Sequence, residues 1–228
     1  MKCIVPCAGE SSRMSYIPKH LIQIQGKPLL QQVTARWQDP VDGFVFIARK
    51  SATYLWEFIP ENTALVFQDE PLGLADAVLK AEPFAGDRFV INLGDCLCRG
   101  QFETKDFELG LGVWETGDLR EVNKSYLVEE VNGLVTRVIE KPNLQKAYPK
   151  MKCGMGVYFF DKRLFTYLRA AKKGFGGDFM QAVQTMINAR EPIAAVHFTG
   201  AYINVTHPED IAKAEELLSV REINTCRS

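Results

Sequence analysis

The sequence predicts an α/β fold with a doubly wound mixed sheet, helices on both faces and an antiparallel extension. Over residues 2–93, short apolar runs rich in β-branched side chains alternate with helical patterns. This alternation is typical of βαβ units and of a parallel sheet covered on both faces. Beyond residue 100 the strand patterns follow one another closely and include an Asn-Gly hairpin signal, which indicates antiparallel pairing.

The first half of the chain is expected to supply the parallel strands. Each expected strand is a short apolar run, and these runs lie at residues 2–6, 43–48, 64–68 and 88–93. The helical patterns between them lie at residues 28–37, 51–59 and 74–82. The first of these begins with Pro28, a residue favoured in the first turn of a helix, and places Leu30, Val33 and Trp37 on one face.

The second half is expected to be mainly antiparallel. Asn132-Gly133 joins two extended runs within residues 126–142, and both residues tolerate a positive φ. Further strands are expected at residues 107–115, 156–161, 193–198 and 202–205. Helices are expected from residue 161 to about 171, over 178–189 with Asp178 as the N-cap, and over 207–220.

Composition excludes several classes of partner. The formal net charge is −1, so no overall basic surface for nucleic acid is expected. No apolar run approaches the ~20 residues that a membrane-spanning helix needs, and the first residues do not have the pattern of a signal peptide. We therefore expect a cytoplasmic protein. The six cysteines lack paired CxxC spacing, which argues against zinc and favours reduced, buried thiols.

The stretch "IVPCAGESSRMSYIPKHL" carries the first chemical signal. A strand is followed by a loop of small residues and then by Arg13 and Lys19. Ligands of open α/β folds bind at the ends of such strands, and backbone amides of small residues form concavities that bind anions. The Walker and GxGxxG patterns are both absent. From composition alone, a surface loop with two solvated cations explains the pattern equally well.

Six segments together resemble the sugar-1-phosphate nucleotidylyltransferases, particularly the UDP-glucose and dTDP-glucose pyrophosphorylases in a compact form. They occur in the family's order: "VPCAGESSRM…IPKHLIQIQGKPLLQQV", "QDEPLGLADAVLKA", "VINLGDCL", "VIEKP", "GMGVYFFD" and "YINVTHPEDI". The resemblance implies a Rossmann-like fold and a single nucleotidyltransferase domain over residues 1–228. Residues 1–100 would form its nucleotide-binding half and residues 101–220 its sugar-phosphate-binding half.

The resemblance also implies roles for individual residues. Arg13 and Lys19 match the family's cations for the triphosphate and the transferred phosphate. The residues that match its nucleotide-binding positions are Ala8, Gly9, Gln68, Pro71 and Gly73. Those that match its sugar-phosphate positions are Glu140, Lys141 and Gly156. Asp95 matches the family's magnesium ligand, and Asn204 stands where a second ligand is common.

The implied reaction joins an NTP to a sugar-1-phosphate, with Mg²⁺ as cofactor. A sugar-phosphate oxygen attacks the α-phosphorus and pyrophosphate leaves. This nucleophile is already an anion, so catalysis depends on alignment and on neutralising charge rather than on a general base. Gln68 favours a pyrimidine nucleotide, and the sequence leaves the oligomeric state open.

Three departures from the family pattern keep alternatives open. Ser11 replaces a glycine, Cys96 follows Asp95 where many members have a second Asp, and Asn204 replaces an Asp. One alternative is a cytidylyltransferase for a non-sugar phosphate such as phosphocholine, with Trp114, Tyr126 and Tyr158 as ring donors. Another is a catalytically weak homologue that binds nucleotide or sugar phosphate. We interpret His20 as an exposed loop residue.

Overall fold

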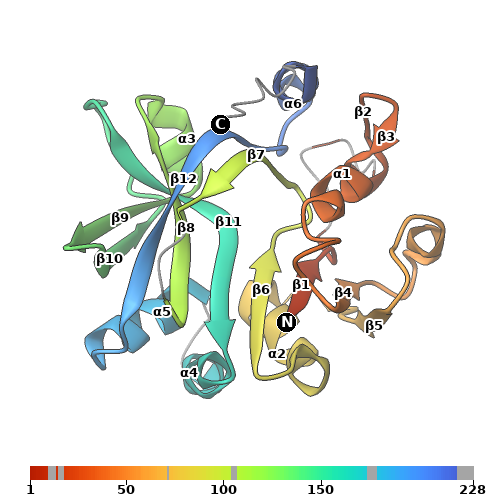
Figure 1. Cartoon of the computed structure of the whole chain (residues 1–228), viewed down its shortest axis with the longest axis horizontal. Helices are drawn as coiled ribbons and strands as arrows, with labels where there is room; N and C mark the ends of the chain where they lie inside the picture. The colour runs from red at the N-terminus through yellow and green to blue at the C-terminus, as the bar shows by residue number, and fades with distance from the viewer. Residues whose placement is uncertain (10–13, 15–17, 71, 104–106, 174–178, 220–228) are drawn as a thin grey trace, which may run out of the picture.

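The computed structural model describes residues 1–9, 14, 18–70, 72–103, 107–173 and 179–219. Over these residues the main feature is a ten-stranded mixed sheet (Figure 1). Its strand order is β5-β4-β1-β6-β11-β8-β12-β10-β9, with β7 paired to β12. The predicted α/β fold class with a mixed sheet is confirmed.

One end of the sheet is parallel. Its strands are β5 (Thr63–Phe67), β4 (Gly43–Ala48), β1 (Lys2–Pro6) and β6 (Arg88–Asn92). All residues of β4 are buried. In β1, Ile4 and Val5 point to opposite faces, because they belong to separate buried clusters. This two-sided burial explains why these strands are continuous apolar runs rather than alternating patterns.

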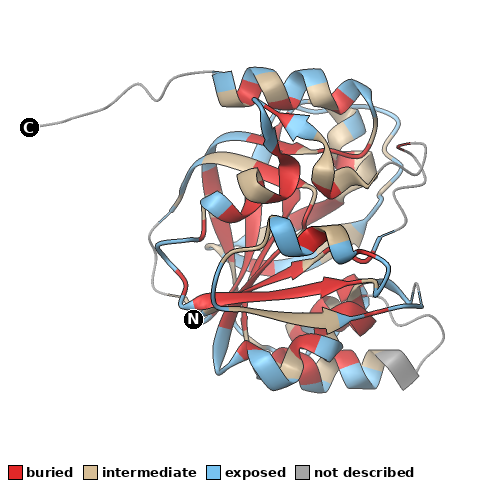
Figure 2. Ribbon diagram, turned by 90° about the vertical axis from the view of Figure 1, so that its right-hand side faces the viewer, coloured by how far each residue is buried: buried red, intermediate tan, exposed pale blue. Residues whose placement is uncertain are grey.

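Helices cover both faces of the sheet. The helices α2 (Gly73–Ala85), α4 (Arg163–Lys173) and α5 (Phe179–Asn188) contact one another and share one apolar cluster (Figure 1). On the opposite face, Leu30 of α1 (Leu29–Ala35) and Leu55 of the 3-10 helix η3 (Thr53–Glu57) belong to a second cluster. Figure 2 shows the buried strands lying between these layers.

The other end of the sheet is largely antiparallel. It contains β11 (Met151–Asp161), β8 (Leu109–Thr116), β12 (Ile193–Asn204), β10 (Leu134–Glu140) and β9 (Tyr126–Val131). The hairpin predicted at Asn132-Gly133 is confirmed, since these residues have φ of 53° and 79° and connect β9 to β10. The helix α3 (Leu119–Lys124) lies at this end, whereas α6 (Glu209–Ser219) contacts both β12 and β2 (Gln23–Ile24) of the first half.

The prediction of two strands over residues 193–205 was wrong, because β12 is one continuous strand. Its first part pairs with β8, and its second part pairs with β7 (Cys96–Phe102), a strand that no sequence pattern predicted. Gly200 faces Gly100, and both have φ of 144°. A Cβ on either glycine would overlap the opposing backbone. Gly200 therefore permits close pairing of β12 with β7 rather than ending a strand.

Other element boundaries also differ from the prediction. The helix expected at 51–59 is only η3, and α1 begins after Pro28 and ends at Ala35. The helix α2 continues through Pro83 to Ala85. No sequence pattern predicted α3, the short 3-10 helix η2 (Lys19–Leu21) or the two-stranded sheet of β2 (Gln23–Ile24) and β3 (Lys27–Pro28). Asp178, the proposed N-cap, lies outside the described residues.

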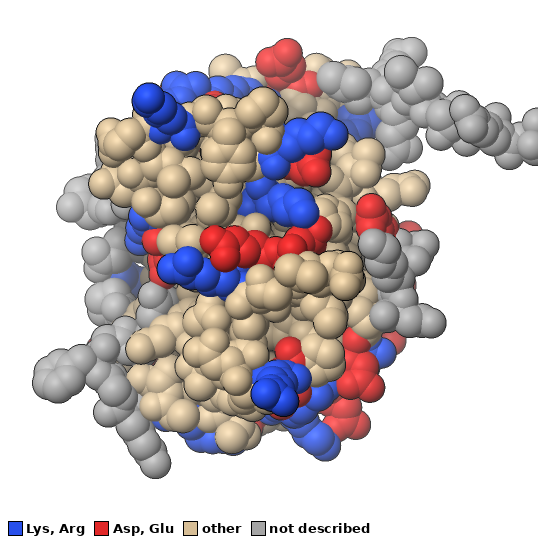
Figure 3. Space-filling view, turned by 90° about the vertical axis from the view of Figure 1, so that its left-hand side faces the viewer, with Lys and Arg blue, Asp and Glu red and all other residues tan. Residues whose placement is uncertain are grey.

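The charged side chains are mixed on the face shown in Figure 3. Acidic and basic groups lie next to one another there, so this face has no extended patch of one sign. Within the described residues, no helix is long and apolar enough to cross a membrane.

Candidate active site

The candidate site lies where the first parallel strands end. The Gly94 N–H donates to Pro6 O at 3.3 Å, and the Cys7 N–H donates to Ile47 O at 2.7 Å. The segments that follow β1, β4 and β6 therefore meet at one edge of the sheet. This is the position at which open α/β sheets bind ligands.

A first cavity of about 220 Å³ lies beside this edge. Four of the predicted nucleotide-binding residues line it, namely Ala8, Gly9, Gln68 and Gly73. Among the described residues, no atom of a residue other than the neighbours of Gly9 in the chain lies within 4 Å of the position that a Cβ on Gly9 would take, so this part of the structure leaves the backbone open to a ligand. We call this space the nucleoside cavity. Arg13, Ser11 and Pro71 lie outside the described residues.

Gln68 has a structural role in this cavity. Its side chain is buried, and its Nε2 donates to Gly73 O at 3.0 Å and to Asp76 Oδ2 at 2.9 Å. These bonds fix the first turn of α2, where Gly73 has a φ of 84°. Both amide hydrogens are thereby used within the protein, so a contact from Gln68 to a base has to be made by its carbonyl oxygen.

Lys19 and Asp95 form an ion pair at the centre of the site. Lys19 Nζ lies 2.7 Å from Asp95 Oδ2, and both side chains are mostly buried. Asp95 directly follows the Gly94 turn, and its backbone carbonyl accepts a hydrogen bond from the Val205 N–H at 2.8 Å. This hydrogen bond joins the segment after β6 to the end of β12, although Asp95 and Val205 are 110 residues apart in the sequence.

A second cavity of about 390 Å³ surrounds this ion pair. We call it the phosphate cavity because of its charges: three lysines face one carboxylate. Among the described residues, the charged ones that line it are Lys19, Lys124, Lys141 and Asp95, and its other lining residues include Asn204, Thr206 and His207. Such an excess of ammonium groups is suited to an anionic ligand.

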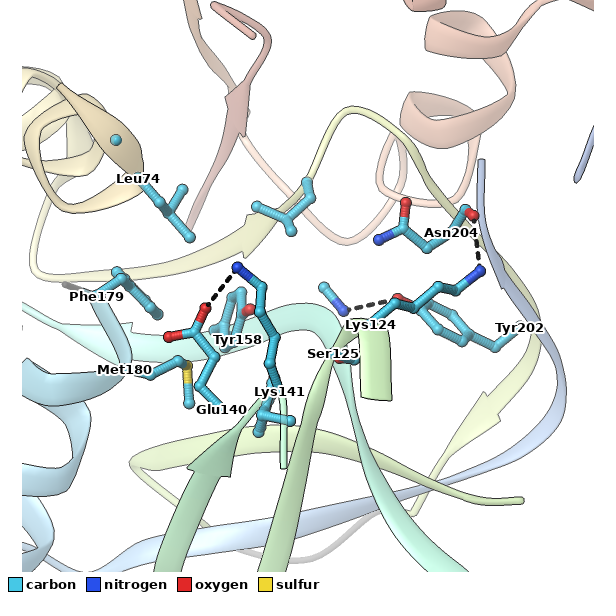
Figure 4. A pocket seen from close by; sticks show the side chains of 14 residues that line it. Leu74, Lys124, Ser125, Glu140, Lys141, Tyr158, Phe179, Met180, Tyr202 and Asn204 are labelled. Atoms are coloured by element: carbon cyan, nitrogen blue, oxygen red, sulfur yellow. Dashed lines mark hydrogen bonds and ion pairs between the residues drawn. The ribbon is translucent and has the colours of Figure 1, made fainter. Parts of the chain in front are cut away.

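A third cavity of about 460 Å³, the acceptor cavity, contains the predicted sugar-phosphate residues. Glu140 and Lys141 project into it from the end of β10, and their side chains approach to 3.5 Å (Figure 4). The Lys141 N–H donates to Ser125 O at 2.8 Å and the residue has a φ of 43°, which fixes the turn. Tyr126, Tyr158 and Phe179 form an apolar wall.

Gly156 lines the acceptor cavity but has a clear packing role. Its N–H donates to the Tyr202 hydroxyl at 3.0 Å, and a Cβ on Gly156 would overlap Cys96 Sγ. Cys96 is itself buried, and its thiol lies 3.2 Å from the same hydroxyl. Burial raises the pKa of this thiol well above its ordinary value. Cys96 therefore packs in the core and does not replace a second carboxylate.

The predicted magnesium ligands lie together at the phosphate cavity. Asp95 and Asn204 both line it, and Asn204 Oδ1 accepts a hydrogen bond from Thr206 Oγ1 at 2.9 Å. Carboxylate and amide oxygens fit Mg²⁺, which is commonly bound by one or two carboxylates together with substrate phosphates. Because Lys19 occupies Asp95 Oδ2, a metal ion would have to share or displace this contact. In the described part of the chain, no group of three or more His, Cys, Asp or Glu side chains is arranged to hold a metal.

The sequence prediction was wrong for the burial of His20 and gave no indication of Lys124. His20 is buried rather than exposed, at 5% exposure, and burial lowers its pKa to about 4, so it is neutral near pH 7. Lys124 lines both the phosphate cavity and the acceptor cavity but belongs to none of the motifs. A lone lysine at the end of a six-residue helix gives no sequence signal.

The described residues have the Rossmann-like fold of solved nucleotidyltransferases, and the candidate site lies at the strand edge of this fold. A UDP-glucose pyrophosphorylase solved with UDP-glucose is 23% identical, with a TM-score of 0.79 over 94% of this chain and 97% of that one. The inositol-1-phosphate CTP transferase of T. maritima is 19% identical, with a TM-score of 0.77 over 96% and 94%. A UTP-bound UGPase of Acinetobacter baumannii is 18% identical, with a TM-score of 0.75 over 94% and 92%.

The sequence comparisons point to the same class of protein. Residues 3–98 match the MobA-like NTP transferase domain, which confirms the resemblance to nucleotidyltransferases. The bifunctional protein GlmU of Methanocaldococcus jannaschii is 26% identical over 99% of this chain and 56% of that protein. The low-salt glycan biosynthesis nucleotidyltransferase Agl11 of Haloferax volcanii is 25% identical over 96% and 66%. The chain thus spans about half to two thirds of these relatives.

Proposed function

We propose that the chain transfers a nucleoside monophosphate from an NTP to a sugar-1-phosphate, giving an NDP-sugar and pyrophosphate. The observation that carries this proposal is that the three cavities share lining residues. Gly73 and Leu74 line both the nucleoside and acceptor cavities. Lys124, Lys141 and Asn204 line both the acceptor and phosphate cavities. A nucleotide and a phosphorylated acceptor can therefore lie next to each other with their phosphates on the lysine-rich side.

The residues present suit a reaction without a general base. The attacking phosphate oxygen is already ionised, so the protein has to align two anions and offset their repulsion. Lys19, mostly buried beside Asp95, would contact the transferred phosphate. Lys141 would hold the acceptor's phosphate, and Glu140 would accept hydrogen bonds from hydroxyls of the sugar. Arg13 remains our candidate for the triphosphate.

Asp95 and Asn204 would hold Mg²⁺. When bound, this ion would neutralise phosphate charge and orient the triphosphate. Replacement of a carboxylate by Asn204 lowers the negative charge of the site, so we expect weak metal binding that is strengthened by the nucleotide. The UTP-bound and UDP-glucose-bound structures of this fold support a pyrimidine nucleotide. The relatives favour the sugar-phosphate acceptor over phosphocholine.

Pyrophosphate release from a grid of substrates tests this function. The purified chain is incubated with Mg²⁺, each of UTP, dTTP, CTP, ATP and GTP, and a panel of sugar-1-phosphates together with phosphocholine. We expect turnover with a pyrimidine NTP and a sugar-1-phosphate. Turnover with phosphocholine alone would assign the cytidylyltransferase function instead. An NTP-dependent rise in melting temperature without turnover on any acceptor would favour the nucleotide-binding homologue.

A further inference from the structure

The boundary between the acceptor and phosphate cavities has an unusual composition. The three residues common to both cavities include two lysines, Lys124 and Lys141, together with Asn204. Figure 4 shows Lys141 entering from the end of β10 and Lys124 approaching Asn204 from the other side. Two ammonium groups that line the same space repel each other. An anion placed between them is attracted to both.

Lys124 also forms ion pairs with two acidic residues that line neither of these cavities. Its Nζ lies 2.9 Å from Glu121 Oε1, one turn earlier in α3, and 3.9 Å from Asp210 Oδ1. A longer hydrogen bond of 3.5 Å runs to Asn204 O. Neither Glu121 nor Asp210 lines the acceptor or phosphate cavity. With a side chain 24% exposed, the ammonium is restrained yet remains accessible to a ligand.

The segment beside Lys124 is also fixed. Asp210 Oδ2 accepts hydrogen bonds from the Thr206 and His207 N–H groups at 2.8 and 2.9 Å. These bonds order the chain between β12 and α6, and the Val205 N–H joins the same segment to Asp95. The position of the ammonium is therefore linked to the position of the proposed metal ligands. Such preorganised charge is more effective than a freely rotating surface lysine.

The distribution of lysines separates the two substrates. Lys19 lines the phosphate cavity but not the acceptor cavity, whereas Lys124 and Lys141 line both. None of the three lines the nucleoside cavity. A phosphate covalently attached to a ligand in the acceptor cavity has to lie at this shared boundary, within reach of the two shared lysines.

We propose that Lys124 is a second lysine that binds the phosphate group of the acceptor, opposite Lys141. The inference rests on the proposed function for the identity of the acceptor, and it deepens that function by assigning a binding residue. Glu121 and Asp210 then act as positioning residues for Lys124. A compact ammonium on a flexible stem is suited to a phosphate that approaches from one direction.

Calorimetric titration of the full chain tests the proposal without requiring turnover. The probe is glucose-1-phosphate, added alone and in the presence of saturating α,β-methylene-UTP and Mg²⁺. Lys124→Met should weaken binding of glucose-1-phosphate at least tenfold and change the affinity for the nucleotide analogue less than twofold. Lys124→Arg, which keeps the charge, should restore binding to within about threefold.

Lys152→Met is the matched control. Lys152 also makes a short contact to a mostly buried carboxylate, 2.6 Å to Glu130 Oε1, and its side chain is 33% exposed. It lines neither the acceptor nor the phosphate cavity. If Lys124→Met is unstable because Glu121 is left unpaired, Glu121→Gln combined with Lys124→Met removes that charge and keeps the test valid.

The outcomes separate this inference from the proposed function. Unchanged binding of glucose-1-phosphate by Lys124→Met would overturn the inference, as would an equal loss for the nucleotide analogue. Failure of the wild-type chain to bind glucose-1-phosphate under either condition would also count against it. Lys124-dependent binding without pyrophosphate release on any substrate pair would support the inference and overturn the proposed function.

Discussion

The parallel and antiparallel halves of the molecule contribute to the candidate site in different ways. In the parallel half, Ala8, Gly9 and Asp95 lie within three residues of the end of a buried strand, and Gly9 lines the nucleoside cavity without a side chain. In the antiparallel half, the contribution is mainly charged and polar side chains at the last residues of three elements. These residues are Lys124 of α3, Glu140 of β10 and Asn204 of β12. The first half therefore offers an open strand edge, and the second half adds most of the charge that defines an acceptor.

The largest expected effect comes from the residue that joins the two halves. Asp95→Ala should lower kcat at saturating Mg²⁺ by at least about 100-fold, the size seen when one preorganised electrostatic group is lost. The physical reason is the loss of a proposed metal ligand and of the partner of Lys19. Steady-state kinetics over a range of Mg²⁺ concentrations measure the effect, with Asp87→Ala as a surface control. Undiminished activity of a folded Asp95→Ala would remove this residue from the metal site.

A smaller and more selective effect is expected in the antiparallel half. Lys141→Ala should raise KM for the acceptor roughly 10- to 100-fold, which corresponds to the ~1.5–3 kcal/mol of a hydrogen bond to a charged group. KM for the NTP should change little, because Lys141 does not line the nucleoside cavity. Initial-rate measurements with each substrate varied in turn test this, and Lys146→Ala in the same loop is the control. A defect confined to the NTP would contradict the assignment of the two halves.

A pair of glycine substitutions compares the packing of the two halves. Gly156→Ala should destabilise the protein by about 1–3 kcal/mol, the usual cost of overpacking, because its Cβ would overlap Cys96 Sγ. Gly9→Ala should leave the stability nearly unchanged, because the described residues beyond its chain neighbours place no atom within 4 Å of its Cβ, and should instead raise KM for the NTP. Urea unfolding measures both variants. Equal stability of the two would mean that the close packing around Gly156 is absent.

The smallest effect concerns an ion pair of the antiparallel half that lies outside the site. Burial would raise the pKa of Glu130, but the contacts with Lys152 and His197 outweigh it and leave this pKa below its ordinary value. A carboxyl with a lowered folded-state pKa contributes stability above its unfolded pKa and loses that contribution as pH falls through the folded value.

Glu130→Gln should therefore cost about 1 kcal/mol at pH 7, the typical size of one hydrogen bond. The difference from the wild type should shrink as pH falls below the ordinary glutamate value of 4.5. Thermal unfolding of both proteins between pH 3 and pH 7 measures it, and a difference that is independent of pH would contradict this account. Activity per folded molecule should not change.

The sequence by itself determined the fold class, the strand–loop position of Gly9 and Asp95, and the hairpin at Asn132-Gly133. These features depend on local properties, namely the periodicity of apolar residues, the small residues after a strand and the tolerance of positive φ. The tertiary structure decided which charged residues meet. Lys124 and Asn204 are 80 residues apart and come together only because β12 ends next to the last residue of α3.

The tertiary structure likewise decided which residues are buried. His20 belongs to a polar, charged loop sequence, yet it is 5% exposed because η2 packs it against the Gly94 turn. Gly200 is part of one strand because a second glycine, Gly100, lies opposite it. In each case the deciding contact comes from a segment distant in sequence, whose distance and orientation no local pattern specifies. The same reason explains why the six motifs indicated Lys141 and not Lys124.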